Sequence, residues 1–124
     1  PPNCAAATPS PSKINTANGA MTNIAVNGVT GDGTITLTTQ TIHQDEPVSG
    51  GVNGTTTPDA TLSPRAVRAE RLSSGNGGNG RMYHIAVQAT SPYGSCTKVV
   101  KVCVPLTSNG NCTDGGALYV STAQ

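Results

Sequence analysis

The sequence predicts an all-β fold, an antiparallel β-sandwich, from its composition, its alternating apolar positions and its evenly spaced turn residues. Thr, Ser, Asn and Gly dominate the 124 residues, which include 15 Gly and 9 Pro. Thr favours strands, whereas Gly, Asn and Pro favour turns. About six or seven short strands, roughly 10 residues apart with turn residues between them, are typical of a sandwich. A chain of this length suits one domain with a modest core.

The first half of the chain contains an arm and two or three short strands. Residues 1–12, PPNCAAATPSPS, are predicted to be an extended N-terminal arm, because Pro is excluded from central strands. Residues 13–124 then form a single domain. Alternating apolar residues predict strands at 20–29 and 34–43, and residues 66–72 are a short strand or a helical turn.

The second half carries the most specific fold signal, a hairpin. Residues 81–89 and 96–104 alternate apolar side chains on either side of the turn Ser91-Pro92-Tyr93-Gly94. One predicted face carries Tyr83, Ile85, Val87 and Ala89, and the other strand presents Val100, Val102 and Val104. Residues 73–80 are a flexible glycine loop, and residues 117–121 are a candidate final strand.

Four cysteines, an even number, indicate disulfides and an oxidising compartment. Cys96 and Cys103 are seven residues apart in one strand, so they lie on opposite faces and are not expected to bond each other. Of the three pairings that four cysteines allow, we favour Cys103 with Cys112, across a Pro/Asn/Gly loop, and Cys4 with Cys96. We expect a secreted protein, located outside the cell or at its surface.

Charge and motifs argue against several classes of function. The net charge is +1 and the basic residues are scattered, so no field for nucleic acid and no membrane anchor is expected. His43 and His84 are the only histidines, and neither belongs to a Gly-x-Ser-x-Gly or His-Glu-x-x-His motif. We therefore predict surface histidines and no enzymatic activity.

One acidic stretch, QDEP, stands out in a chain that is only 10% charged. Asp45 and Glu46, together with Asp59 and Glu70, could converge and bind calcium, which takes six to eight oxygen ligands. The alternative, which we favour, is that Asp45 or Glu46 pairs with Arg68 or Arg71 at a structural corner, and no cofactor is bound. Asn53 and Asn111 each begin an Asn-x-Thr sequon and are candidate glycosylation sites, or unmodified polar surface.

Several short motifs recur in a fixed order along the chain. They are Gln44–Pro47, Pro58–Ala60, Arg68–Arg71, Gly78–Arg81, Tyr83–Ile85 and Val102–Pro105. With these motifs, the sequence resembles extracellular Ig-like domains of bacterial secreted and surface proteins, related to HYR-type and cadherin-like modules. The resemblance extends from about Cys4 to Thr122. The resemblance implies an Ig-like sandwich of about seven strands. Residues 51–55 lack the acids that many such domains carry after QDEP, which weakens the calcium hypothesis.

These features favour a non-enzymatic structural protein, the subunit of an extracellular filament or pilus-like appendage. Copies of the chain would be its partners, and a strand donated by the N-terminal arm or by residues 117–121 would pair with the open sheet edge of the next copy. Such head-to-tail contacts need not close, so they generate filaments. The alternative function is an adhesion module that binds a surface glycan or calcium.

Overall fold

The computed structural model describes residues 1–124 and confirms the all-β antiparallel fold. Its only helical element is one 3-10 turn, η1 (Ser74–Asn76), so it contains no helix long and apolar enough to cross a bilayer. The strands are β1 (Thr8–Ser10), β2 (Met21–Asn23), β3 (Ala25–Asn27), β4 (Thr36–Gln44), β5 (Ala60–Thr61), β6 (Ala66–Arg68), β7 (Arg81–Ser91), β8 (Gly94–Val104) and β9 (Tyr119–Val120).

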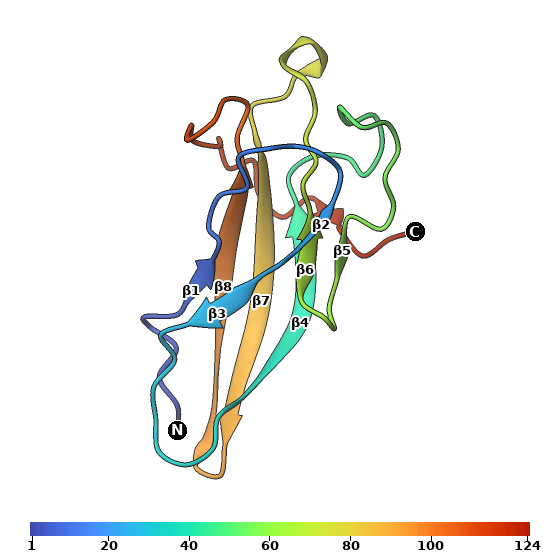
Figure 1. The fold of residues 1–124 in the computed structure, drawn as a ribbon. Helices are drawn as coiled ribbons and strands as arrows, with labels where there is room; N and C mark the ends of the chain where they lie inside the picture. The colour runs from blue at the N-terminus through green and yellow to red at the C-terminus, as the bar shows by residue number, and fades with distance from the viewer.

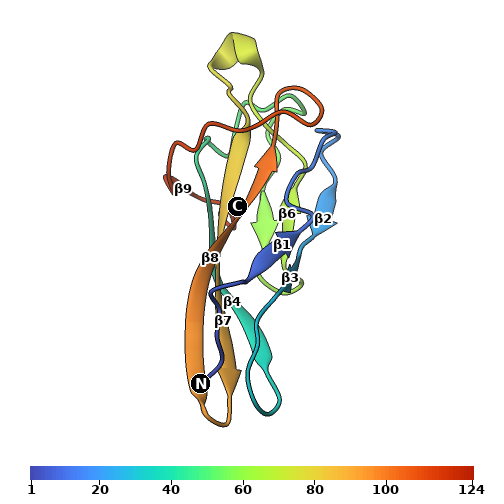
Figure 2. The same cartoon turned by 90° about the vertical axis from the view of Figure 1, so that its left-hand side faces the viewer.

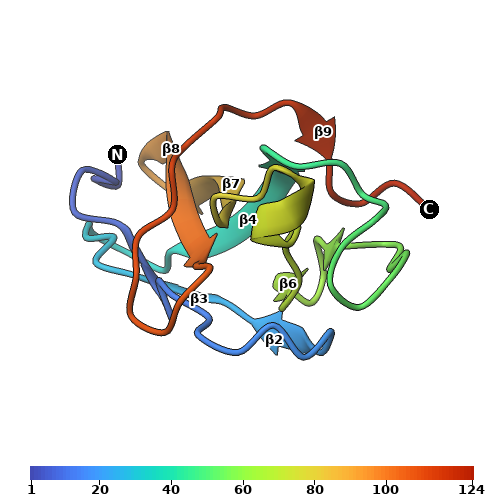
Figure 3. The same ribbon diagram turned by 90° about the horizontal axis from the view of Figure 1, so that it is seen from above.

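The strands form two layers. One layer is a four-stranded sheet with the order β8-β7-β4-β9, and the facing layer consists of the pair β1-β3 and the three-stranded sheet β2-β6-β5 (Figures 1 and 3). Every strand pair within these sheets is antiparallel. This is a sandwich-like arrangement, in which every strand of the second layer is only two or three residues long.

The β7–β8 hairpin is the scaffold of the molecule. Its register runs without interruption from Ser91↔Gly94 at the turn to Arg81↔Val104 at the far end, which confirms the predicted hairpin. The inward face of the hairpin supplies half of the twelve core residues, and the others come from β4 and from the second layer. The core cluster contains Ala7, Ile24, Val26, Ile42, Ala60, Val67, Tyr83, Ile85, Val87, Val100, Val102 and Val104.

The N-terminal arm is extended, as expected, but it is packed against its own domain. Residues 8–10 form β1, which pairs with β3, and Asn3 pairs with Thr30 in an isolated bridge. Cys4 and Ala7 are buried, and the main chain of Ser12 and Ile14 hydrogen-bonds to Cys103 on the outer edge of β8. The arm therefore covers one edge of the four-stranded sheet.

The C-terminal residues reach the opposite edge of that sheet. We call residues 105–121 the C-terminal strap, because they leave β8, run along the outer face of the sheet and end in β9 beside β4 (Figure 2). At Ser121 the chain crosses between the layers: its N–H donates to Ile42 O, and its C=O accepts from the N–H groups of Asp59 and Ala60. The strap thus closes part of the flank between β4 and β5.

Candidate functional site

The two disulfides confirm the pairing that the sequence favoured. Cys4 bonds Cys96, and Cys103 bonds Cys112, so no free cysteine remains. The first disulfide fastens the N-terminal arm to β8, and the second fastens the start of the strap to the other end of the same strand. Both termini are therefore anchored to the hairpin.

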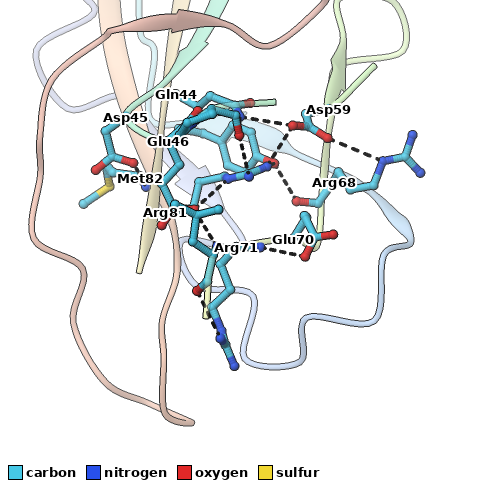
Figure 4. Close-up of polar contacts among 12 residues, drawn as sticks. Gln44, Asp45, Glu46, Asp59, Arg68, Glu70, Arg71, Arg81 and Met82 are labelled. Atoms are coloured by element: carbon cyan, nitrogen blue, oxygen red, sulfur yellow. Dashed lines mark hydrogen bonds and ion pairs between the residues drawn. The ribbon is translucent and has the colours of Figure 1, made fainter. Parts of the chain in front are cut away.

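A buried polar cluster occupies the end of the sandwich where the acidic residues meet (Figure 4). Its centre is Arg81, whose side chain is 1% exposed. Nε of Arg81 lies 3.1 Å from Glu46 Oε1, and Nη1 lies 2.9 Å from Asp59 Oδ2. Nη1 also donates to the Tyr83 hydroxyl at 3.2 Å, and Nη2 donates to Pro47 O. We call these residues, with Gln44, the Arg81 cluster.

The cluster corrects the expected pairing of the QDEP segment. Glu46 pairs with Arg81 and accepts the N–H of Leu72, and it makes no ion pair with Arg68 or Arg71. Arg68 lies 3.9 Å from Asp59 instead. The sequence carried a signal for this: Arg81 shares the odd-numbered face of β7 with Tyr83 and therefore points inward. Arginine is seldom fully buried unless it is paired, so this inward position alone does not predict which carboxylates surround it.

The other two acids of the calcium hypothesis are bound elsewhere. Asp45 accepts the backbone N–H groups of Met82 at 2.9 Å and Gly115 at 3.0 Å. Glu70 accepts from Asn53, through both its N–H and its side-chain amide, and from the N–H of Arg71. The four carboxylates lie at one end of the molecule, but each faces its own protein donors. No group of three or more acidic, His or Cys side chains is arranged to hold a metal ion.

Burial dominates the electrostatics of the Arg81 cluster. It raises the pKa of Glu46, although the Leu72 N–H and Arg81 both favour the ionised form. Glu46 Oε2 is buried without a partner, which acts in the same direction. Burial likewise raises the pKa of the Tyr83 hydroxyl, which donates to Arg68 O. With Arg81, Asp59 and Tyr83 at most 1% exposed, the cluster holds strands together and offers little surface to a ligand.

The two sequons differ in structure. Nδ2 of Asn53 donates to Ala17 O and to Glu70 Oε1, so this amide is used within the fold. Asn111 is exposed, and only its Oδ1 is bonded, by Lys13 Nζ at 3.0 Å. Of the two amide nitrogens, only that of Asn111 is available for a sugar in the folded chain.

The outer face of the sheet carries an exposed ionic clamp on the strap. Asp114 lies 2.8 Å from His84 Nε2 on β7 and 2.7 Å from Lys101 Nζ on β8. The hydrogen bond from Lys101 is the main cause that lowers the pKa of Asp114 to about 2. His84 points outward, as its alternation with Tyr83 predicts, and lies directly across from His43 on β4.

Asp114→Asn is expected to loosen the strap at neutral pH. Exposed ion pairs contribute about 0.2–1 kcal/mol, so amide-exchange protection of Leu118 and Ser121 should fall by about 1.5- to 5-fold. A carboxylate with a lowered pKa stabilises the fold above its unfolded-state pKa, and this contribution is lost as the pH falls towards about 2. The two proteins should therefore converge at that pH. Equal protection at pH 7, with Asp32→Asn as the control, would contradict the clamp.

The class of protein defined by these features is a disulfide-bonded, antiparallel β-sandwich with a buried ionic cluster and an anchored C-terminal strap. No protein-family model, no curated protein and no solved structure matches the chain. Its likeness to bacterial Ig-like domains therefore stays a prediction.

Proposed function

We propose that this chain is a secreted structural protein, the subunit of an extracellular filament whose copies join by exchanging β9. The observation that carries the proposal is the weak attachment of an apolar edge strand. β9 pairs with β4 through only two residues, His43↔Val120 and Gln44↔Tyr119. Leu118, Tyr119 and Val120 are 64%, 40% and 51% exposed, and such an edge is a template for pairing with another chain.

The strap supplies the length that an exchange requires. Residues 113–118, which follow the disulfide from Cys103 to Cys112, run over the outer face of the sheet, where the Asp114 clamp and single backbone bonds hold them. If the strap lifts, the β9 of one copy can make the same pairs with His43 and Gln44 of the next copy. Because the same contacts form within and between chains, exchange costs little free energy apart from association. When copies join head to tail, the assembly need not close into a ring, so it can extend as a filament.

The N-terminal arm is less suited to donation. Its disulfide from Cys4 to Cys96 is covalent, and β1 already pairs along its length with β3. The two disulfides are compatible with an oxidising extracellular environment, where a subunit must survive without chaperones. The Ig-like resemblance supports the same reading, because such modules serve as repeated extracellular units.

A disulfide that locks β9 onto its own β4 is expected to abolish assembly. His43→Cys with Val120→Cys joins two residues that lie directly opposite each other. Oxidised as a dilute monomer, this variant should show no filaments by negative-stain electron microscopy and should elute as a monomer. The matched control, Thr90→Cys with Ser95→Cys, locks the static β7–β8 hairpin and should assemble like the parent chain.

Mixing the two single variants tests the exchange directly. His43→Cys and Val120→Cys, combined before assembly and then oxidised, should give disulfide-linked dimers on a non-reducing gel. Filaments from the locked variant would overturn strand exchange. A parent chain that remains monomeric at every concentration would overturn the filament function itself.

A further inference from the structure

One acidic side chain lacks a partner, and it lies at the opposite end of the molecule from the Arg81 cluster. Five of the six acidic side chains accept hydrogen bonds within the chain, and the exception, Asp32, is exposed in the loop between β3 and β4. Its neighbour Gly33 lies against the hairpin turn: a Cβ there would be 3.1 Å from Pro92 Cδ and 3.4 Å from Tyr93 Cε2. Asp32 and the turn therefore form one surface, which we call the tip (Figure 1).

Tyr93 makes the tip apolar as well as acidic. Its side chain is 65% exposed, the highest value among the large apolar residues of the molecule. The hairpin register requires only that the turn be short, and the ring contributes nothing to the core cluster. An exposed tyrosine beside a free carboxylate combines a rigid contact surface with a charge, as in the anchors of protein interfaces.

A groove on the flank between β4 and the β5–β6 turn has the complementary chemistry. It has a volume of about 570 Å³, and its apolar lining includes Ile24, Leu37 and Leu62. Beside it, the edge of β4 that faces away from β7 has no partner strand from Thr36 to Thr41, since β9 pairs only with His43 and Gln44. The groove is therefore bounded by an open sheet edge.

Arg65 gives the groove an uncompensated positive charge. Its Nε donates to Ile24 O at 2.9 Å and its Nη1 donates to Thr39 Oγ1 at 3.2 Å, and no carboxylate lies within ion-pair distance. Burial lowers the pKa of this guanidinium, because nothing nearby offsets the loss of water around the charge. An incoming carboxylate would stabilise it.

We propose that the tip of one copy docks in the groove of a second copy, with Asp32 on Arg65 and the Tyr93 ring against the apolar lining. The chain supplies one free carboxylate beside an exposed ring, and one unpaired guanidinium beside an apolar hollow, and these features complement each other in charge and kind. Tip and groove are different patches, so the contact is heterologous and extends from copy to copy. The inference rests on the proposed function in that the partner is a second copy.

The test is a charge exchange followed by sedimentation of the folded, oxidised chain. Asp32→Arg and Arg65→Glu should each weaken self-association by about tenfold or more, because each turns an attraction into a repulsion. The double variant restores the pair with its charges reversed, so its association should return to near the parent level. High salt should reduce all these differences. Lys98→Glu, an equal charge change on β8 at the opposite edge of the sheet, is the control and should have little effect.

A second variant guards against a folding defect. Arg65 is half-buried and its substitution can destabilise the chain, whereas Asp32 and Tyr93 are exposed, so Asp32→Arg and Tyr93→Ala should melt like the parent and still weaken association. Unchanged association in both would overturn the docking, as would a folded double variant whose self-association does not recover.

If the β9 lock stops assembly while these variants do not, docking fails and the filament function stands. If the parent chain does not self-associate and its tip binds only an unrelated protein, that result would also overturn the proposal.

Discussion

Arg81→Met is expected to lower the free energy of unfolding by about 3–5 kcal/mol at pH 7. The change leaves Glu46 and Asp59 buried at 4% and 0% exposure without the cation that compensates them. It also removes the donors to the Tyr83 hydroxyl and Pro47 O. Urea denaturation of the oxidised protein would measure the loss.

Two further comparisons show whether the uncompensated charge is the cause. The loss should be smaller at pH 4 than at pH 7, because Glu46, whose pKa burial has already raised, then takes up a proton more readily. Adding Glu46→Gln and Asp59→Asn to the variant should recover part of the stability. Arg71→Met, a half-buried arginine with no carboxylate partner, is the control and should cost under about 1 kcal/mol. Equal losses at residues 81 and 71 would contradict this account.

Removing the disulfide from Cys4 to Cys96 is expected to cost about 4–5 kcal/mol, against about 2–3 kcal/mol for the disulfide from Cys103 to Cys112. The difference follows from loop length, since the cysteines are 92 and 9 residues apart in the two pairs. Paired Cys→Ser variants, unfolded in urea, would measure both losses. A core without Phe or Trp has little stability to spare, so the first variant should unfold below 37 °C.

The two disulfide variants should also differ in where the loss appears. Without the bond at Cys112 the strap loses its covalent anchor, so amide protection should fall first at Leu118 and Ser121, with the hairpin unaffected. Without the bond at Cys4 the arm is freed, and protection should fall at the amide of Asn3. A larger effect for the short loop than for the long one would contradict the chain-entropy explanation.

The local sequence was sufficient to predict those structural features that depend on the alternation of residues within one strand. The alternation of residues 83–89 and 100–104 predicted which face of the β7–β8 hairpin is buried, and residues 91–94 predicted where the hairpin turns. The same two-residue period placed Cys96 and Cys103 on opposite faces and so excluded one of the three pairings, and the favoured choice between the other two is the one that the structure shows. These outcomes depend on the period of a strand, which contacts elsewhere in the chain cannot alter.

Features that depend on contacts between distant segments required the tertiary structure. Strand β5 has two residues and β1 contains a proline, so neither has a pattern that sequence could reveal. The partner of Glu46 is 35 residues away, and nothing in QDEP distinguishes Arg81 from Arg68 or Arg71.

By itself, the sequence determined the strand period and the buried face of the hairpin of this β-protein, and it excluded a bond between Cys96 and Cys103. The tertiary structure alone decided that the arm is packed, that Glu46 and Asp59 meet Arg81 rather than a metal, and that Asp32 and Arg65 have no ion-pair partner in the chain. The physical reason is that periodicity is a property of a few consecutive residues. Charge pairing depends on which loops the fold brings within a few ångströms of each other.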